Sequence, residues 1–332
     1  MKKAIILARS FARSAKDPLR RLEAAGIQVE IKKNPNPENE DTVSELINDA
    51  EGVLVGMDRV GEVVFTNCPN LKVVSKHGVG VDNIDIQSAQ KHGVVVANAP
   101  GTNSVSVAEM TFTLMLVLAR KIPHFIEQIK NKEWGATSFG LELEGKTIGI
   151  VGFGRIGKNV AQYAQAFAMK VLYYDPFINN EILPYKKVEL EKLFKDADFI
   201  SLHAPLTEET REMVNDKLLS LMKKEAFLIN TARGELINEE ALYIYLKESR
   251  IAGAALDVFT HEPPFDNPLL SLPNVIATPH ISSHTREANL KMGNIAAENI
   301  FRIQCFNISN IKPDTVMKIN FIQIELIIFY CP

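Results

Sequence analysis

Three polar side chains, Arg233, Glu262 and His280, follow apolar strand-like runs in the second half of the chain. An arginine can grip a carboxylate with its planar guanidinium, and a histidine can take or return the proton of a hydroxyl group. A glutamate bonded to the second ring nitrogen would orient the imidazole and favour its protonated form. Each residue alone is more often structural. Together, beside a nicotinamide, they suit hydride transfer at a carbon that bears a hydroxyl group next to a carboxylate.

The stretch VGFGRIG predicts the cofactor site that such a reaction needs. Gly152, Gly154 and Gly157 have the spacing G-x-G-x-x-G, which permits a sharp turn, close approach of a pyrophosphate and close packing of helix on strand. Asp175 ends the next strand-like run, at about the distance expected for a carboxylate that binds ribose hydroxyls. Because a carboxylate would repel a 2′-phosphate, the pattern favours NAD over NADP. A cap on the strand is the structural alternative for Asp175.

Apolar strand-like runs alternate with helical or turn-rich segments along the whole chain, which predicts an α/β fold with doubly wound parallel sheets. The carboxyl ends of parallel strands meet at one edge of a sheet, so the polar clusters that follow them should lie beside the nicotinamide. In the second half the predicted strands cover residues 147–151, 170–174, 198–203, 226–230, 253–258 and 274–278.

The chain before residue 98 has the same alternation of strand-like and helical segments but lacks the G-x-G-x-x-G spacing. Thr42 followed by Glu45 is a capping-box pattern that supports one of its helices. Its predicted strands cover residues 4–8, 27–31, 52–55, 71–75 and 94–97.

The loop KHGVGVDNID, residues 76–85, follows the fourth of these strands. Backbone amides around Gly78 to Gly80, with Lys76 beside them, could hold an anionic group at the carboxyl end of the strand. A turn that needs positive φ at its glycines explains the composition equally well.

The 332 residues are enough for two domains, and the net charge of −3 implies no polyanion as partner. Cys68, Cys305 and Cys331 share no metal-ligand spacing, so we expect no metal and a reduced, cytoplasmic compartment. The apolar run near the N-terminus is too short for a secretory signal.

A segment of about 104–120 is apolar nearly all the way round, which predicts a helix buried on several sides. Its apolar stretch is too short to span a bilayer. Together with Trp134 it indicates a surface between domains or between subunits, and core packing is the alternative for Trp134.

Five motifs in register, VGFGRIG, HAPLTEET, LINTARGELI, AALDVFTHEP and ATPHISSHT, resemble the D-isomer-specific 2-hydroxyacid dehydrogenases. The similarity runs from about Lys72 to Phe306. The order and separations of Arg233, Glu262 and His280 are similar to the catalytic triplet of that family, and the resemblance implies the same roles here.

The resemblance also implies the domain organisation. A Rossmann NAD-binding domain, residues 98–284, would be inserted into a flavodoxin-like substrate domain, residues 1–97 and 285–320, with a cleft between them. A homodimer would form largely through the inserted domain. The apolar tail, residues 321–332, departs from the usual polar end of the family and has no assigned role.

The binding residues that the resemblance implies fall into two groups. Those for the cofactor are Gly152, Gly154, Arg155, Ile156, Gly157, Asp175, Ala204, Thr231, Ala232, Asp257 and Ser283. Those for the substrate are Lys76, Val79, Gly80 and Arg233, of which Val79 is also implied as a cofactor contact.

Within the family the loop at Lys76 is most similar to that of the phosphoglycerate dehydrogenases. It implies oxidation of D-3-phosphoglycerate to 3-phosphohydroxypyruvate, the first step of serine biosynthesis. A glyoxylate or hydroxypyruvate reductase is the nearest alternative, and a scaffold protein that senses NAD(H) is a third. No regulatory domain of the long phosphoglycerate dehydrogenases is expected after Phe306.

Two residues depart from the family pattern. Ala168 stands where glycine is common after the first cofactor helix, and Glu225 interrupts a turn of the KKGA type. A left-handed backbone at Glu225 would cost roughly 1–2 kcal/mol of stability.

Overall fold

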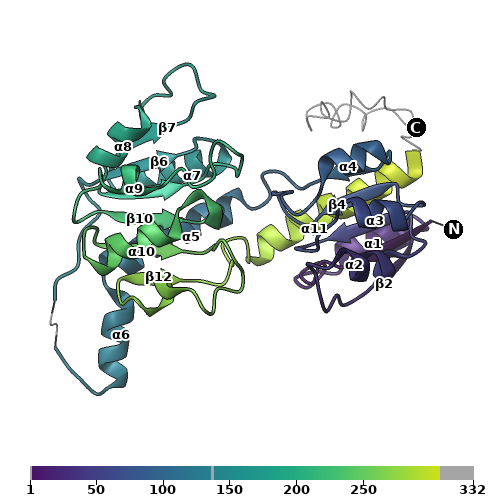
Figure 1. Cartoon of the computed structure of the whole chain (residues 1–332), viewed down its shortest axis with the longest axis horizontal. Helices are drawn as coiled ribbons and strands as arrows, with labels where there is room; N and C mark the ends of the chain where they lie inside the picture. Colours follow the sequence, from purple (N-terminus) through teal and green to yellow (C-terminus); the bar gives the residue numbers. More distant parts are fainter. Residues whose placement is uncertain (1, 136–137, 307–332) are drawn as a thin grey trace. The chain divides into compact units, whose positions relative to one another are not determined.

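The computed structural model describes residues 2–135 and 138–306, and the chain divides into two units (Figure 1). The first takes the residues up to Asn103 and those from Arg286 on, and the second is Ser104–Thr285. These limits lie a few residues from those expected from the sequence. The tail expected at 321–332, and the end of the segment expected at 285–320, lie outside the described residues.

The first unit is built on a parallel sheet with the strand order β2-β1-β3-β4-β5, which is the flavodoxin-like order. The predicted strands are confirmed, with ends shifted by one or two residues. Their bounds are β1 Lys3–Ile6, β2 Gln28–Ile31, β3 Gly52–Val55, β4 Val73–Lys76 and β5 Val95–Ala97.

Helices cover both faces of this sheet because its strands are apolar on both sides. One face packs against α2 (Glu40–Ile47), α3 (Glu62–Asn67) and α4 (Ile86–Lys91). The other face packs against α1 (Asp17–Ala24) and α11 (Arg286–Phe306). The final helix therefore returns to the first unit, as the sequence predicts.

The capping box predicted at Thr42 and Glu45 is wrong. Helix α2 begins at Glu40, and the side chain of Asn39 caps it by accepting a hydrogen bond from the Thr42 amide at 2.8 Å. Asn39 is as good a cap as threonine and lies three residues earlier, so Thr42 is already inside the helix.

The second unit has a parallel sheet in the order β12-β11-β10-β9-β6-β7-β8, which contains the doubly wound order of dinucleotide-binding domains. After β8 at one edge of the sheet, the chain crosses to the other side of β6 and adds β9 there, so the strand order switches between β6 and β9. The bounds are β6 Thr147–Val151, β7 Lys170–Tyr174, β8 Lys186–Lys187, β9 Phe199–Leu202, β10 Phe227–Asn230, β11 Gly253–Leu256 and β12 Val275–Ala277.

This sheet also has a core on each face, formed with helices on either side. One core includes residues of α5 (Ser104–Ala119) and α7 (Arg155–Ala166). The other includes residues of α8 (Leu190–Asp196), α9 (Asp216–Leu219) and α10 (Glu239–Lys247). The remaining elements are α6 Ile122–Lys130 and the 3₁₀ turns η1 Gly234–Leu236 and η2 Pro268–Ser271.

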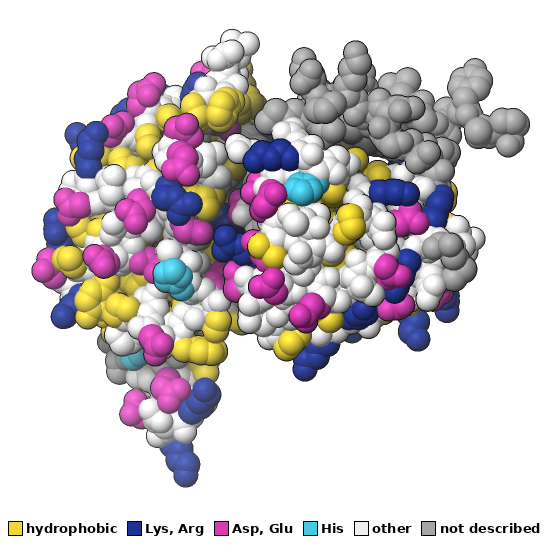
Figure 2. Space-filling view, turned by 45° about the vertical axis from the view of Figure 1, so that its right-hand side comes forward, with side chains coloured by type: hydrophobic (Ala, Val, Ile, Leu, Met, Phe, Trp, Pro, Cys, Tyr) yellow, Lys and Arg dark blue, Asp and Glu magenta, His cyan; other side chains and the backbone are white. Residues whose placement is uncertain are grey.

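Helix α5 is buried on several sides, as its apolar composition predicts. Trp134, in contrast, is 94% exposed, so core packing is excluded for it. Among the described helices, none combines the length and the apolar character needed to cross a bilayer. On the face seen in Figure 2, basic and acidic side chains are interspersed rather than separated by sign.

The strain expected at Glu225 falls on Ala168 instead. Ala168 has a φ of +54°, whereas Glu225 does not adopt a positive φ. The Ala168 amide donates to Gln165 O and the Met169 amide to Ala164 O, so α7 ends in a Schellman motif whose left-handed residue is an alanine.

Replacing Ala168 by glycine should therefore stabilise the protein by about 0.5–1 kcal/mol. Relief of the left-handed strain, about 1–2 kcal/mol, outweighs the greater freedom of glycine in the unfolded chain. Urea unfolding measures the change. Glu225→Gly is the matched control, and it should lower the free energy of unfolding; equal effects of the two substitutions would contradict the assignment.

Candidate active site

The three glycines of the fingerprint serve three different purposes after β6. Gly152 has a φ of +89°, and a Cβ there would lie 2.7 Å from the carbonyl carbon of His203. A Cβ on Gly157 would lie 2.3 Å from Gly152 O, so this glycine lets α7 pack against the turn. Around Gly154 no atom lies within 4 Å of the Cβ position, which leaves open space at the helix N-terminus. The turn fits a pyrophosphate.

Gly154 is the N-cap of α7, so Arg155 and Ile156 occupy the first turn of the helix. The backbone amides of a first turn have no partner within the helix and carry the positive end of its dipole. These two predicted cofactor residues can thus offer amides to an anion.

Asp175 directly follows β7 and binds the glycine turn. Its Oδ2 accepts a hydrogen bond from the Phe153 amide, and its Oδ1 accepts one from the Phe177 amide, both at 2.9 Å. The capping contact considered for this residue is present. A carboxylate can accept about four hydrogen bonds, so capacity for ribose hydroxyls remains.

The other predicted cofactor residues follow successive strands of the same sheet. Ala204 comes after β9, Thr231 and Ala232 after β10, Asp257 after β11, and Ser283 in the segment after β12. Since the strands are parallel, all of them lie toward one edge.

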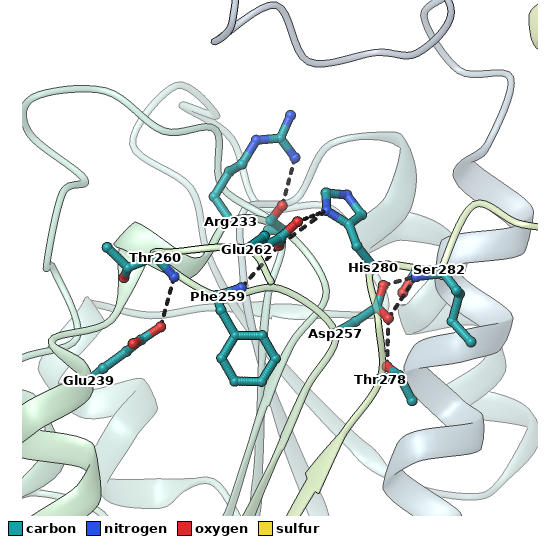
Figure 3. Close-up of polar contacts among 11 residues, drawn as sticks. Arg233, Glu239, Asp257, Phe259, Thr260, Glu262, Thr278, His280 and Ser282 are labelled. Carbon is teal, nitrogen blue, oxygen red and sulfur yellow. Dashed lines mark hydrogen bonds and ion pairs between the residues drawn. The ribbon is translucent and has the colours of Figure 1, made fainter. Parts of the chain in front are cut away.

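Glu262 and His280 point toward each other at this edge (Figure 3). Their closest approach is 2.9 Å, between His280 Nδ1 and Glu262 Oε2. An ionised carboxylate only accepts hydrogen bonds, so Nδ1 carries the hydrogen. Nε2 is then the ring nitrogen that can exchange a proton with a substrate.

Opposing influences act on the pKa of Glu262. Burial raises it, but the hydrogen bond and charge of His280, the Phe259 amide and the charge of Arg233 together hold the pKa of the carboxyl below its ordinary value. Glu262 is therefore ionised at neutral pH and can stabilise a protonated imidazole.

Arg233 is positioned by the last residue of β10. Asn230 is buried; its amide group donates to Arg233 O at 2.7 Å, and its carbonyl oxygen accepts from the Ala232 amide at 3.0 Å. The Arg233 guanidinium donates to Ala232 O at 2.7 Å. In Figure 3 it lies beyond the strand ends, on the side where Glu262 and His280 meet.

Three positioning residues escape the motif analysis: Asn230, Gly234 and Glu239. A Cβ on Gly234 would lie 2.0 Å from the carbonyl carbon of Phe259, so only glycine lets the Arg233 turn press against the segment that leads to Glu262. Glu239 accepts a hydrogen bond from the Thr260 amide of the same segment at 2.8 Å. The only sequence signal for any of these three residues is the glycine that follows Arg233 in the ARG motif.

The predicted substrate loop lies in the first unit. Lys76 is the last residue of β4 and is 6% exposed. Its ammonium donates to Gly56 O and to Asn83 Oδ1.

The glycines of this loop do not need a left-handed backbone. Neither Gly78 nor Gly80 has a positive φ, so a turn requiring positive φ does not explain them. Val79 O accepts a hydrogen bond from the Asn98 side chain at 2.7 Å. The substrate role of Lys76, Val79 and Gly80 stays a prediction.

His203, directly after β9, is a half-buried histidine to which the sequence predictions assign no role. Its Nε2 lies 2.8 Å from Ser201 Oγ, and its Nδ1 is buried with no hydrogen-bond partner among the described residues. Burial lowers the pKa of His203 from 6.5 to about 3. The imidazole is therefore neutral in the folded protein.

We expect this histidine to make folding sensitive to mild acid. Its pKa is depressed in the folded state, so the unfolded chain binds the proton first and stability is lost as the pH falls below 6.5. Between pH 7.5 and pH 5 the loss should be about 2 kcal/mol. Unfolding titrations of the wild type and of His203→Gln measure it; parallel pH profiles would contradict the assignment.

Comparison with known proteins gives a family match over the second unit. Residues 112–282 match the model described as D-isomer specific 2-hydroxyacid dehydrogenase, NAD binding domain. That stretch covers about half of the chain and includes the glycine turn and all three residues of the triplet.

Two relatives extend the similarity over both units. The chain is 46% identical over 293 residues to D-3-phosphoglycerate dehydrogenase of Methanocaldococcus jannaschii, covering 86% of this chain and 55% of the relative. It is 40% identical over 304 residues to glyoxylate reductase of Thermococcus litoralis, covering 88% of this chain and 91% of the relative. The chain thus spans about half the length of the phosphoglycerate dehydrogenase.

A solved structure shares the fold. NAD-dependent formate dehydrogenase from Staphylococcus aureus, in complex with NAD, is 30% identical with a TM-score of 0.82, covering 94% of this chain and 97% of that chain.

Proposed function

We propose, since the chain belongs to the D-isomer-specific 2-hydroxyacid dehydrogenase family, that it transfers a hydride between NAD and C2 of a D-2-hydroxy acid. The observation that carries the proposal is the pair of Glu262 and His280, joined at 2.9 Å in the loops after β11 and β12, with Arg233 after β10. The matched family model describes an NAD-binding domain, and the glycine turn and Asp175 fit that cofactor.

The bound cofactor supplies the hydride acceptor, or in its reduced form the donor. Arg233 binds the carboxylate of the acid and polarises the oxygen on C2. His280 takes the hydroxyl proton on Nε2 during oxidation and returns it during reduction. Glu262 stabilises the imidazolium that results, because its carboxylate is ionised and bonded to Nδ1.

For the substrate we propose D-3-phosphoglycerate, as in serine biosynthesis. The similarity to the M. jannaschii phosphoglycerate dehydrogenase and the basic residue Lys76 support this choice. The second candidate is glyoxylate or hydroxypyruvate reduction, which is favoured by the T. litoralis relative, since the chain covers 91% of it.

The deciding experiment is loss of NADH absorbance with phosphohydroxypyruvate, hydroxypyruvate, glyoxylate and pyruvate offered separately. A strong preference for the phosphorylated acid supports the serine-pathway function. Preference for a small unphosphorylated acid keeps the mechanism and replaces the substrate. NADH binding without turnover of any acid contradicts the dehydrogenase function and favours a scaffold that senses NAD(H).

We further propose a homodimer formed through α5, α6 and the residues that follow. Helix α6 projects from its unit in Figure 1. It leaves Ile122, Ile126 and Ile129 exposed at helical spacing, and Trp134 beyond it is almost fully exposed. An apolar stripe of this kind is typical of a surface that another chain covers.

Charge on this stripe should separate the subunits. We expect Ile126→Glu combined with Ile129→Glu to convert a dimer into a monomer in sedimentation velocity, because two buried carboxylates in the interface would lack partners. Ile31→Glu, at an exposed isoleucine of β2 in the other unit, is the matched control. A wild-type monomer, or a dimer that survives both charges, would contradict the interface.

A further inference from the structure

Asp257 lies under the histidine loop, and its carboxylate is occupied by that loop. The residue is 1% exposed. Its Oδ1 accepts hydrogen bonds from Thr278 Oγ1 at 2.5 Å and from the Ile281 amide at 2.9 Å, and its Oδ2 accepts one from the Ser282 amide at 2.8 Å. Figure 3 shows Asp257 between Thr278 and the segment that leads to Ser282.

His280 stands in the middle of the segment that Asp257 holds, and its backbone is left-handed with a φ of +53°. Its amide donates to Asp257 O at 2.9 Å and to Thr278 O at 3.0 Å. A residue other than glycine keeps a left-handed backbone only when several surrounding contacts hold it in that conformation. Here contacts from both sides of His280 converge on one aspartate.

We propose that Asp257 is a positioning residue for His280. By accepting hydrogen bonds from the residues on both sides, it fixes the left-handed backbone that aims the imidazole at Glu262. The proposal rests on the acid–base role proposed for His280. It assigns the Asp257 carboxylate to the histidine loop in place of the cofactor contact that the family resemblance implies.

The geometry requires both carboxylate oxygens. An asparagine side chain of the same shape has one oxygen and one NH₂ group, so the NH₂ group must face either the Ile281 amide or the Ser282 amide. Either way two donors meet, and one amide loses its acceptor. Asp257→Asn therefore releases the loop without creating a cavity.

The test is a double-mutant cycle with His280. We expect Asp257→Asn to lower kcat about tenfold in a wild-type background, with the Kd for NADH changed less than about twofold. In a His280→Asn background the same substitution should change kcat less than about twofold, since a residue that acts through His280 has nothing left to position. A raised Kd for NADH, or a tenfold loss that persists without His280, would overturn the proposal.

Asp198→Asn is the matched control. This aspartate also accepts a backbone amide of the same sheet, that of Thr147 at 2.8 Å, but directly before β9 and thus at the amino edge. It should lower the melting temperature and leave kcat within about twofold. A tenfold loss of kcat here would assign the effect to general loosening of the unit, against the proposal.

Two milder substitutions at Thr278 test the same proposal if the Asp257→Asn variant does not fold. Thr278→Val removes one donor to Oδ1, whereas Thr278→Ser keeps it. We expect a kcat loss of about threefold for valine and none for serine; equal values for the two would overturn the proposal.

A crystal structure of the folded Asp257 or Thr278 variant supplies a readout without turnover. The φ of His280 should leave the left-handed region, and an unchanged φ would contradict the positioning role. Should the wild-type protein turn over none of the four acids, the proposed function fails, while this structural result still decides whether Asp257 holds the loop.

Discussion

Replacing His280 by asparagine is expected to lower kcat by roughly a hundredfold to ten-thousandfold while NADH still binds. General acid–base help is worth this much when the acting group is lost and the rest of the site stays in place. Asparagine is the substitution of choice because His280 has a φ of +53°, and asparagine tolerates a left-handed backbone better than glutamine does. Steady-state kinetics together with titration of NADH fluorescence separate the two effects.

His261 gives the matched control. It is an exposed histidine beside Glu262 in the same loop, and no role is assigned to it. His261→Asn should leave kcat within about twofold, as surface substitutions usually do. Turnover of the His280 variant at the wild-type rate would falsify the acid–base role, and weakened NADH binding would assign the residue to the cofactor.

The second large effect is expected at Gly234. A methyl group there would lie 2.0–2.4 Å from the backbone of Phe259 and Thr260, so the segment that leads to Glu262 must move away from the Arg233 turn. A displacement of about 1 Å can cost a hundredfold in rate, and that is the loss of kcat expected for Gly234→Ala. The free energy of unfolding should fall by about 1–3 kcal/mol as well.

Gly154 is the control for this substitution. An added Cβ at Gly154 meets no atom within 4 Å, so Gly154→Ala should keep its stability and weaken NADH binding instead. Equal melting temperatures for the Gly234 variant and the wild type would show that the close approach is not needed. A similar loss of stability in both variants would assign the effect to glycine replacement in general.

The sequence predicts the sheets well because their signals are local and repeated. Apolar runs separated by helical segments predict parallel strands, and the structure confirms the two doubly wound sheets. The carboxyl-edge rule then brings Glu262 and His280 to one edge although eighteen positions separate them in sequence. The topology brings the two loops together, because β11 and β12 are neighbours.

What could not be predicted depends on close approaches between distant segments. The close approach of Gly234 to Phe259 is seen only in the structure, because a glycine at that position is equally compatible with a simple turn. The left-handed backbone of His280 is also invisible, because nothing in the residue type requires it. The contact of Lys76 with Gly56 O joins the end of β4 to the segment after β3, which a motif confined to residues 76–85 does not reveal.

Local errors arose where two residues compete for one role. Thr42 fits a capping box, but Asn39 caps the helix three residues earlier. Glu225 and Ala168 both depart from glycine-rich patterns, yet only Ala168 is left-handed. In the first case the pattern gives the right feature three residues too late, and in the second the strain lies at the other of the two departures from the family pattern.

The strand order has a consequence for how the site fails. β12 is the outermost strand of its sheet and pairs only with β11, whereas β10, which precedes Arg233, is enclosed by β9 and β11. Outer strands open in local fluctuations that leave the interior of a domain intact. Activity would then disappear through fraying at His280 while Arg233 and the substrate carboxylate stay in register, so inactivation by heat would precede global melting.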